Sequence, residues 1–215
     1  MLYRLAIFDF DGTLVDTREA ILAALMQAMD EAGLPRPEPA VVLPLVGLSL
    51  PIVLRRLAGP DADVAALRRG YRRAFAAVSP GRTRLYPGVR ELVDFLAQRG
   101  VALAIATNRG RESAGELLVE HELRARFAEV RGGLCVENPK PHPEMLHRIL
   151  DAVGIAPEAA LMIGDTVYDI ETGKAAGVAT CAVTYGMHDA ADLRAAEPTH
   201  FAADAGEIAG CWRAA

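Results

Sequence analysis

A run of four apolar residues, Leu5 to Phe8, ends at two aspartates, Asp9 and Asp11. Such a run is short for a helix but long enough for a strand buried on both faces, the usual state of strands in parallel sheets. Similar runs recur along the chain, at 101–106, around 130, at 160–163, at 179–183 and, more weakly, at 200–201. Helical patterns alternate with them, at 89–99, 111–120, 143–153 and 169–176. This alternation predicts an α/β fold, a doubly wound parallel sheet with a Rossmann-like core.

The first two predicted strands are separated by a long segment whose periodicity is helical throughout. Apolar residues recur at helical spacing over two stretches, 17–32 and 64–78. Glycine and proline follow both stretches and end them. We therefore expect two domains: a catalytic core of residues 1–15 and 85–215, and an inserted α-helical domain of residues 16–84.

The composition limits the class of protein and its partners. Apolar residues make up 52% of the chain and charged residues 24%, as in soluble globular domains. The apolar run before Asp9 is too short for a signal peptide or a membrane span, so we expect a cytoplasmic protein. The three cysteines are far apart and are expected to be reduced thiols. A net charge of -5 gives no general attraction for a nucleic acid polymer or an anionic membrane.

Polar residues gather where the predicted strands and their loops end. The segments concerned are 9–14 after the first strand, 107–108 after the second, 140–143 at the start of a helix and 164–169 after the strand at 160–163. In open parallel sheets, ligands bind in the crevice outside the carboxyl ends of the strands. We therefore expect these four segments to meet at one site.

Four of the residues in these segments are aspartates, and their charges would repel one another at a buried site unless a cation lay among them. Carboxylate oxygens are hard ligands, which favour Mg²⁺ over zinc. Asp9 and Asp165 are the natural direct ligands. Asp169 lies four residues further on, at the start of a helix, and either binds the ion or orients a group that does.

The same residues suit the hydrolysis of a phosphate ester, which needs a nucleophile, a proton donor and positive charge around the phosphoryl oxygens. Asp9 is a plausible nucleophile, and Asp11 can protonate the leaving oxygen and then deprotonate water. Gly12 lets the backbone approach the phosphate. Donors to the phosphate would come from three further residues, the neutral Thr107 and Asn108 and the cationic Lys140.

In these four segments the sequence resembles the haloacid dehalogenase-like hydrolase superfamily, and within it the phosphatases related to phosphoglycolate phosphatase. Residues 9–14 look like the first family motif, Thr107 the second, Lys140 the third and residues 164–169 the fourth. Each motif is weak alone, but four in the right order, each in its expected structural context, are specific. The resemblance covers essentially the whole chain.

The resemblance implies a mechanism and a set of site residues. An aspartyl-phosphate would form on Asp9, with acid–base work by Asp11, phosphate binding by Thr107 and Lys140, and Mg²⁺ held by Asp9, the backbone carbonyl of Asp11 and Asp165. The helical insert would be a cap that closes over a small phosphorylated metabolite. Our candidates for substrate contact are residues of the first two motifs and of the cap and its facing loop: Gly12, Thr13, Asn108, Arg109, Gly47, Ser49 and Arg55.

Some residues that this chain has, and some that it lacks, argue against membership of other branches of this superfamily. Dehalogenases lack an aspartate at the position of Asp11. A phosphonate-cleaving relative needs a cap lysine to form a Schiff base, and residues 16–84 contain no lysine. A sugar phosphomutase would have a histidine where this chain has Ile21. A phosphatase is therefore favoured, with a phosphomutase and a non-catalytic binding or regulatory protein as alternatives.

The sequence leaves the substrate and the assembly open. Phosphoglycolate, other small sugar or glycerol phosphates, nucleoside monophosphates and pyrophosphate all remain candidates. Monomer and homodimer are both allowed, since no heptad repeat or exposed apolar helix marks an interface. We expect His142 and His188 at the surface, and Thr166 to cap the helix that follows it.

Overall fold

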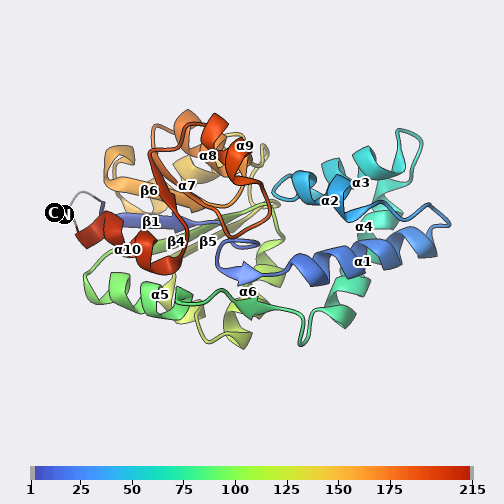
Figure 1. The fold of residues 1–215 in the computed structure, drawn as a ribbon, viewed down its shortest axis with the longest axis horizontal. Helices are drawn as coiled ribbons and strands as arrows, with labels where there is room; N and C mark the ends of the chain where they lie inside the picture. The colour runs from blue at the N-terminus through green and yellow to red at the C-terminus, as the bar shows by residue number, and fades with distance from the viewer. Residues whose placement is uncertain (1–2, 214–215) are drawn as a thin grey trace.

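Six parallel strands form a single sheet in the computed structural model, which describes residues 3–213 (Figure 1). The order across the sheet is β5-β4-β1-β6-β7-β8. The strands are β1 (Leu5–Phe8), β4 (Ala102–Thr107), β5 (Glu129–Gly132), β6 (Ala160–Gly164), β7 (Ala179–Val183) and β8 (His200–Ala202). The chain winds outward in both directions from β1, so the prediction of a doubly wound parallel sheet is confirmed.

Both faces of the sheet are buried at its centre, which explains why β1 and β6 are apolar at every position. Ala6 and Phe8 of β1 belong to the cluster under one face, whereas Leu5 and Ile7 belong to the cluster over the other. The first face is covered by α5 (Val89–Gln98), α6 (Arg111–Glu120) and α10 (Ala205–Arg213). The second is covered by α7 (Glu144–Val153), α8 (Val167–Ala175) and α9 (Ala190–Ala195). The short helices η2 (Arg124–Arg126) and η3 (Pro157–Ala159) lead into β5 and β6.

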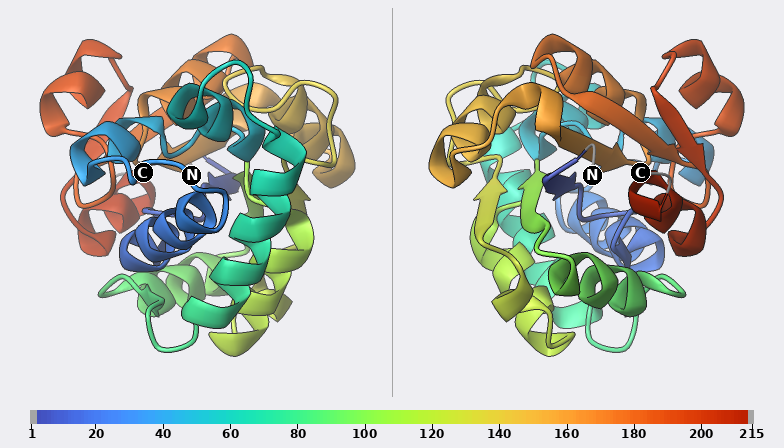
Figure 2. Two further views of the ribbon diagram at one scale, coloured as in Figure 1. Left: turned by 90° about the vertical axis from the view of Figure 1, so that its right-hand side faces the viewer. Right: turned by 90° about the vertical axis from the view of Figure 1, so that its left-hand side faces the viewer.

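Four α-helices in the segment from residue 17 to residue 83 lie beside the carboxyl end of the sheet (Figures 1 and 2). They are α1 (Arg18–Glu31), α2 (Pro39–Val42), α3 (Leu50–Ala58) and α4 (Val64–Val78), with the short η1 (Leu43–Leu45) after α2. They share a small core built around Leu25, Leu54 and Leu67. The chain enters and leaves this group through β2 (Val15–Asp16) and β3 (Arg84–Leu85), which pair antiparallel.

The loop from Pro44 to Gly47 in this helical group is bonded to the core at three points. Tyr168 donates its hydroxyl to the Pro44 carbonyl at 3.1 Å, and Asn108 donates its amide to the Gly47 carbonyl at 2.8 Å. His188 is the third, with Nε2 3.3 Å from the Val46 carbonyl oxygen. The expectation that His188 lies at the surface is wrong: the ring is buried, because the loop packs over it.

Burial lowers the pKa of His188, so its ring is neutral at pH 7 and can donate one hydrogen bond and accept another. Its Nδ1 accepts from the backbone N–H of Val167. Among residues 3–213, no helix combines the length and the hydrophobicity needed to cross a bilayer.

Candidate active site

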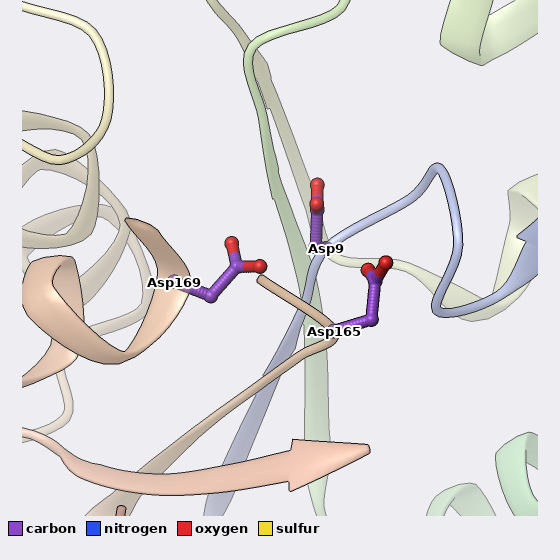
Figure 3. A group of neighbouring side chains, drawn as sticks. All are labelled: Asp9, Asp165 and Asp169. Carbon is purple, nitrogen blue, oxygen red and sulfur yellow. The ribbon is translucent and has the colours of Figure 1, made fainter. Parts of the chain in front are cut away.

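Three carboxylates meet where β1 and β6 end and α8 begins (Figure 3). Asp9 follows β1, Asp165 follows β6, and Asp169 lies in the first turn of α8. One oxygen of each lies within 4.8 Å of the others, and all three side chains are buried. The strands β1 and β6 are hydrogen-bonded neighbours, so the sheet itself brings Asp9 and Asp165 together.

The site has the electrostatics of a cation-binding centre. Burial raises the pKa of Asp9 to about 7, an effect that Lys140 opposes and that Asp169 and Asp11 reinforce. Burial also raises the pKa of Asp165, helped by the charges of Asp9 and Asp169. Among the described residues, Asp9 Oδ1 is buried and accepts no hydrogen bond of good geometry, although Lys140 Nζ forms an ion pair with it at 3.0 Å. An all-carboxylate donor set with an unsatisfied oxygen fits a hard divalent cation such as Mg²⁺.

Lys140 is fully buried between two of these carboxylates. Its Nζ lies 3.0 Å from Asp9 Oδ1 and 2.6 Å from Asp169 Oδ1. Burial alone would lower the pKa of Lys140, but the charges of Asp169 and Asp9 outweigh it and raise the pKa. The other oxygen of Asp169 accepts from the backbone and the hydroxyl of Thr166, which is the expected helix cap. Asp169 therefore has both oxygens engaged and orients Lys140 toward Asp9.

Asp165 is held by groups from two distant loops. Thr13 donates its hydroxyl to Oδ1 at 2.7 Å, and the backbone N–H of Met187 donates to Oδ2 at 2.8 Å. Gly12 and Gly186 pack directly against this carboxylate, where any side chain would collide with it. Gly12 also has a φ of 82°, which favours glycine. Close packing on both sides fixes the position of Asp165.

Asp11 is held by an arginine and a threonine that come from opposite sides of the site. Arg109 donates from Nη2 to Oδ1 at 2.7 Å and from Nε to Oδ2 at 2.9 Å. Thr17 donates its hydroxyl to Oδ1 at 2.6 Å. The Arg109 guanidinium also lies over the ring of Phe75 in α4, 4.2 Å from its centroid. Arg109 thus links the core to the helical group through Asp11 and Phe75.

Thr107 ends β4 and Asn108 follows it, beside Asp9. The Thr107 hydroxyl accepts from the backbone N–H of Arg109, and Thr107 is buried. Asn108 accepts from the backbone N–H of Lys140 at 3.0 Å and donates to its carbonyl at 2.9 Å. Asn108 therefore fixes the loop that carries Lys140.

A cavity of about 490 Å³ lies above Asp9, between the helical group and the core. Its floor includes Asp9, Asp11 and Thr107, and α6 forms part of one wall. Of the predicted substrate contacts, three line it: Asn108, Arg109 and Gly47. The rest of its lining is largely apolar and comes from the helical group.

The other predicted substrate contacts do not line the cavity. Thr13 is buried and bonded to Asp165, beside Gly12. Ser49 precedes α3 without lining the cavity, and Arg55 is exposed in the last turn of α3, near the Pro60 carbonyl. Arg55 is turned away because the face of α3 that lines the cavity is that of Leu50 and Val53.

Sequence reasoning missed three residues of the site. The sequence pattern places Thr17 at the start of a helix and gives it no role in the site, whereas its bond to Asp11 follows from the turn between β2 and α1. Met187 acts through its backbone, which no residue pattern reveals. Tyr71 of α4 lines the cavity, although the sequence pattern indicates only a place in the apolar stripe of its helix.

The fold and the site together define a protein of the doubly wound α/β class, with an aspartate-rich centre at the carboxyl edge of its sheet. The model of the haloacid dehalogenase-like hydrolase family matches residues 6–183. The chain belongs to this family, and the resemblance noted from its motifs is confirmed.

Relatives of known sequence or structure agree with this assignment. The chain is 36% identical over 211 residues to "Probable phosphatase IndB" of Dickeya dadantii, covering 96% of this chain and 92% of that protein. It is 32% identical over 203 residues to phosphoglycolate phosphatase of Pseudomonas putida, covering 91% and 75%. A haloacid dehalogenase-like family protein of Streptococcus pneumoniae has a similar solved structure, with a TM-score of 0.87, 26% identity and 98% of each chain covered.

Proposed function

We propose that this protein is a Mg²⁺-dependent phosphatase that hydrolyses a small phosphomonoester through an aspartyl-phosphate on Asp9. The observation that carries the proposal is the Asp9 carboxylate, which lies on the floor of the cavity with Lys140 and Asp165 beside it. The relatives named phosphatases support the same reaction.

The proposed reaction has two displacements at phosphorus. An oxygen of Asp9 attacks the phosphorus and the bond from phosphorus to the ester oxygen breaks. Asp11, which must enter this step in its protonated form, gives its proton to the departing alkoxide. Asp11 then takes a proton from water, whose oxygen attacks the same phosphorus. The bond to Asp9 breaks, which releases inorganic phosphate and restores the carboxylate.

Several residues of the site would support these steps. Lys140, held by Asp169, would neutralise charge on the phosphoryl oxygens, and Thr107 would donate to one of them. Arg109 and Thr17 would hold Asp11 in position. Mg²⁺, held by Asp9, Asp165 and the carbonyl of Asp11, would reduce repulsion between the phosphate and the carboxylates and polarise a phosphoryl oxygen.

We also propose that residues 16–84 act as a cap on a core of residues 1–15 and 85–215, whose ends at 1–2 and 214–215 lie outside the described residues. The paired strands β2 and β3 are the candidate hinge. The three bonds from Pro44, Val46 and Gly47 to the core would hold the closed state, in which water is excluded from the cavity.

A phosphomutase is less well supported. Such an enzyme would need an acid–base group on the cap, where Ile21 lines the cavity with an aliphatic side chain.

The direct test is phosphate release from a panel of phosphomonoesters with Mg²⁺, comparing the wild type with Asp9→Asn. We expect the substitution to lower the rate by on the order of 10⁴-fold or more, because it removes the nucleophile. Asp151→Asn, at an exposed carboxylate of α7, is the matched control and should keep full activity. Equal rates for Asp9→Asn and the wild type would refute the mechanism, and no release above the Asp9→Asn blank would favour a non-catalytic protein.

A further inference from the structure

The cavity is larger than the smallest candidate substrates require. Its volume of about 490 Å³ falls in the range of pockets that enclose organic ligands of substantial size. Phosphoglycolate has a body of only two carbons beside its phosphate. Most of the space above Asp9 would therefore be left for water, unless the substrate had a larger organic part.

The wall that faces this space is apolar. Val46 and Val53 are only 8% exposed, yet they belong to none of the hydrophobic clusters among the described residues. Both line the cavity instead, as do Leu25 of α1 and Phe75 of α4. Apolar side chains in this position can contact an apolar ligand. Binding of such a ligand would remove the remaining surface of these side chains from water, which is favourable.

Among the described residues, no unpaired cation lines the buried part of the cavity near Asp9, where a second anionic group of a small substrate would lie. Among the described lining residues, the cations are Arg109 and Arg72. Arg109 is bound by Asp11, and Arg72 is exposed beside Gly110 at the edge. Tyr71 stays neutral, because burial raises its pKa to about 12.

The outer wall would repel a second anion. Glu112, Glu116 and Glu120 lie at successive turns of α6 and line the cavity from the exposed side. A carboxylate such as that of phosphoglycolate would find Arg109 already paired with Asp11 and would lie near these glutamates or the apolar wall. Burial of an unpaired charge against apolar side chains is unfavourable.

We propose that the substrate is a phosphomonoester whose phosphate is its only anionic group and whose alcohol part is uncharged, mainly apolar and larger than two carbons. This inference rests on the proposed phosphatase function for the position of the phosphate. It selects against phosphoglycolate, a bisphosphate or pyrophosphate as the preferred substrate of this chain.

The test compares ethyl, butyl and hexyl phosphate with phosphoglycolate, since simple alkyl groups differ in apolar surface far more than in leaving-group chemistry. The kcat/KM should rise by about fourfold per added methylene, as expected for burial of apolar surface. Butyl phosphate should exceed phosphoglycolate by about tenfold or more. A flat or falling series, or a higher kcat/KM for phosphoglycolate than for butyl phosphate, would overturn the inference.

A pair of matched substitutions tests the wall itself. Val53→Lys places a cation in the cavity, whereas Val41→Lys makes the same change at an exposed position of α2 that does not line it. The ratio of kcat/KM for butyl phosphate over phosphoglycolate should fall about tenfold or more in Val53→Lys and stay unchanged in Val41→Lys. Because this is a ratio within one protein, it does not depend on the folded fraction. An unchanged ratio in Val53→Lys would contradict the inference.

Calorimetry separates this inference from the proposed function. It measures the binding of hexyl phosphate and of phosphoglycolate to Asp9→Asn in the presence of Mg²⁺. If the wild type hydrolyses none of the four esters, the phosphatase proposal fails. The inference about the cavity then stands only if hexyl phosphate binds Asp9→Asn more tightly than phosphoglycolate does, and it falls if the order is reversed or the two are equal.

Discussion

Arg109 and Thr17 determine where the carboxylate of Asp11 lies. Arg109 binds both oxygens of this carboxylate, and its own guanidinium is confined by Phe75. Thr17 lies at the junction of β2 and α1, so its hydroxyl links Asp11 to the start of the helical group. An acid–base group must hold its position to within a fraction of an ångström to act efficiently.

Thr17→Val removes the hydroxyl while keeping the shape of the side chain. We expect kcat to fall roughly tenfold with little change in KM, because Asp11 loses one of its two anchors. The Thr17 side chain makes no capping bond to α1, so the free energy of unfolding should change little. Steady-state kinetics and thermal unfolding check both points. Thr17→Ser restores the hydroxyl and should recover kcat; failure to do so would argue against the positioning role.

At the residue scale, the sequence could predict which side chains meet but not how they bond. Asp9, Thr107 and Asp165 come at strand ends, and parallel strands bring their carboxyl ends to one edge. The pairing of Arg109 with Asp11 joins residues 98 positions apart, which no local pattern specifies. The burial of His188 depends on the loop at Pro44 to Gly47 packing over it, which is likewise a tertiary contact.

The loop before α7 is the element that carries Lys140 to the site. Glu144, in the first turn of α7, accepts from the backbone N–H groups of Asn138 and Glu137 at 2.9 and 3.2 Å. From the other side, Asn108 bonds both backbone groups of Lys140. The loop has no regular secondary structure over most of its length, so these side chains replace the bonds that a strand or helix would make.

Glu144→Gln should loosen this loop. Hydrogen bonds from the backbone of Asn138 and Glu137 and the charge of Arg148 lower the pKa of Glu144 to about 2, from an ordinary value of 4.5. A lowered carboxyl pKa means that the stabilisation is present above pH 4.5 and is lost as the pH falls through about 2.

We therefore expect Glu144→Gln to lower Tm at pH 7, and the difference from wild type to shrink as the pH falls below 4.5. Thermal unfolding across this pH range is the measurement. Glu158→Gln, at an exposed glutamate before β6, is the matched control and should show no such difference. A Tm difference for Glu144→Gln that is independent of pH would contradict the account.

At the element scale, periodicity predicted most of the core. The strand at 160–164 and the helices at 89–98 and 111–120 lie within a residue of their expected bounds, because each has a clear apolar pattern and a glycine or proline close to its ends. The short pieces α2 and η1 were not foreseen. With four residues in α2 and three in η1, both are too short to show a periodicity in the sequence. Their positions depend on packing against α1 and the core.

The whole molecule places like charges at the centre of its fold. Asp9, Asp165 and Asp169 come from parts of the chain far apart in sequence, and their burial is compensated only in part by Lys140. Residual repulsion among them opposes folding, so a cation bound between Asp9 and Asp165 would stabilise the folded chain as well as the site.

Saturating Mg²⁺ should raise the Tm of the wild type by roughly 5–10 °C over the value in chelator. Asp165→Asn should abolish most of this shift, because it removes a buried ligand. The exposed-site variant Asp151→Asn should keep the full shift. Scanning fluorimetry or calorimetry in the two buffers measures it, and an equal shift in Asp165→Asn would place the ion elsewhere.

The most direct test of the account is to detect the phosphorylated enzyme. The wild type with Mg²⁺ and a good alkyl phosphate substrate would be quenched in acid during turnover, digested and analysed by mass spectrometry. We predict a phosphoryl group on the peptide that contains Asp9, located at Asp9 by fragmentation and absent from Asp9→Asn. A phosphoryl group on another residue, or rapid turnover with none trapped on Asp9, would contradict the central claim that this carboxylate is the nucleophile.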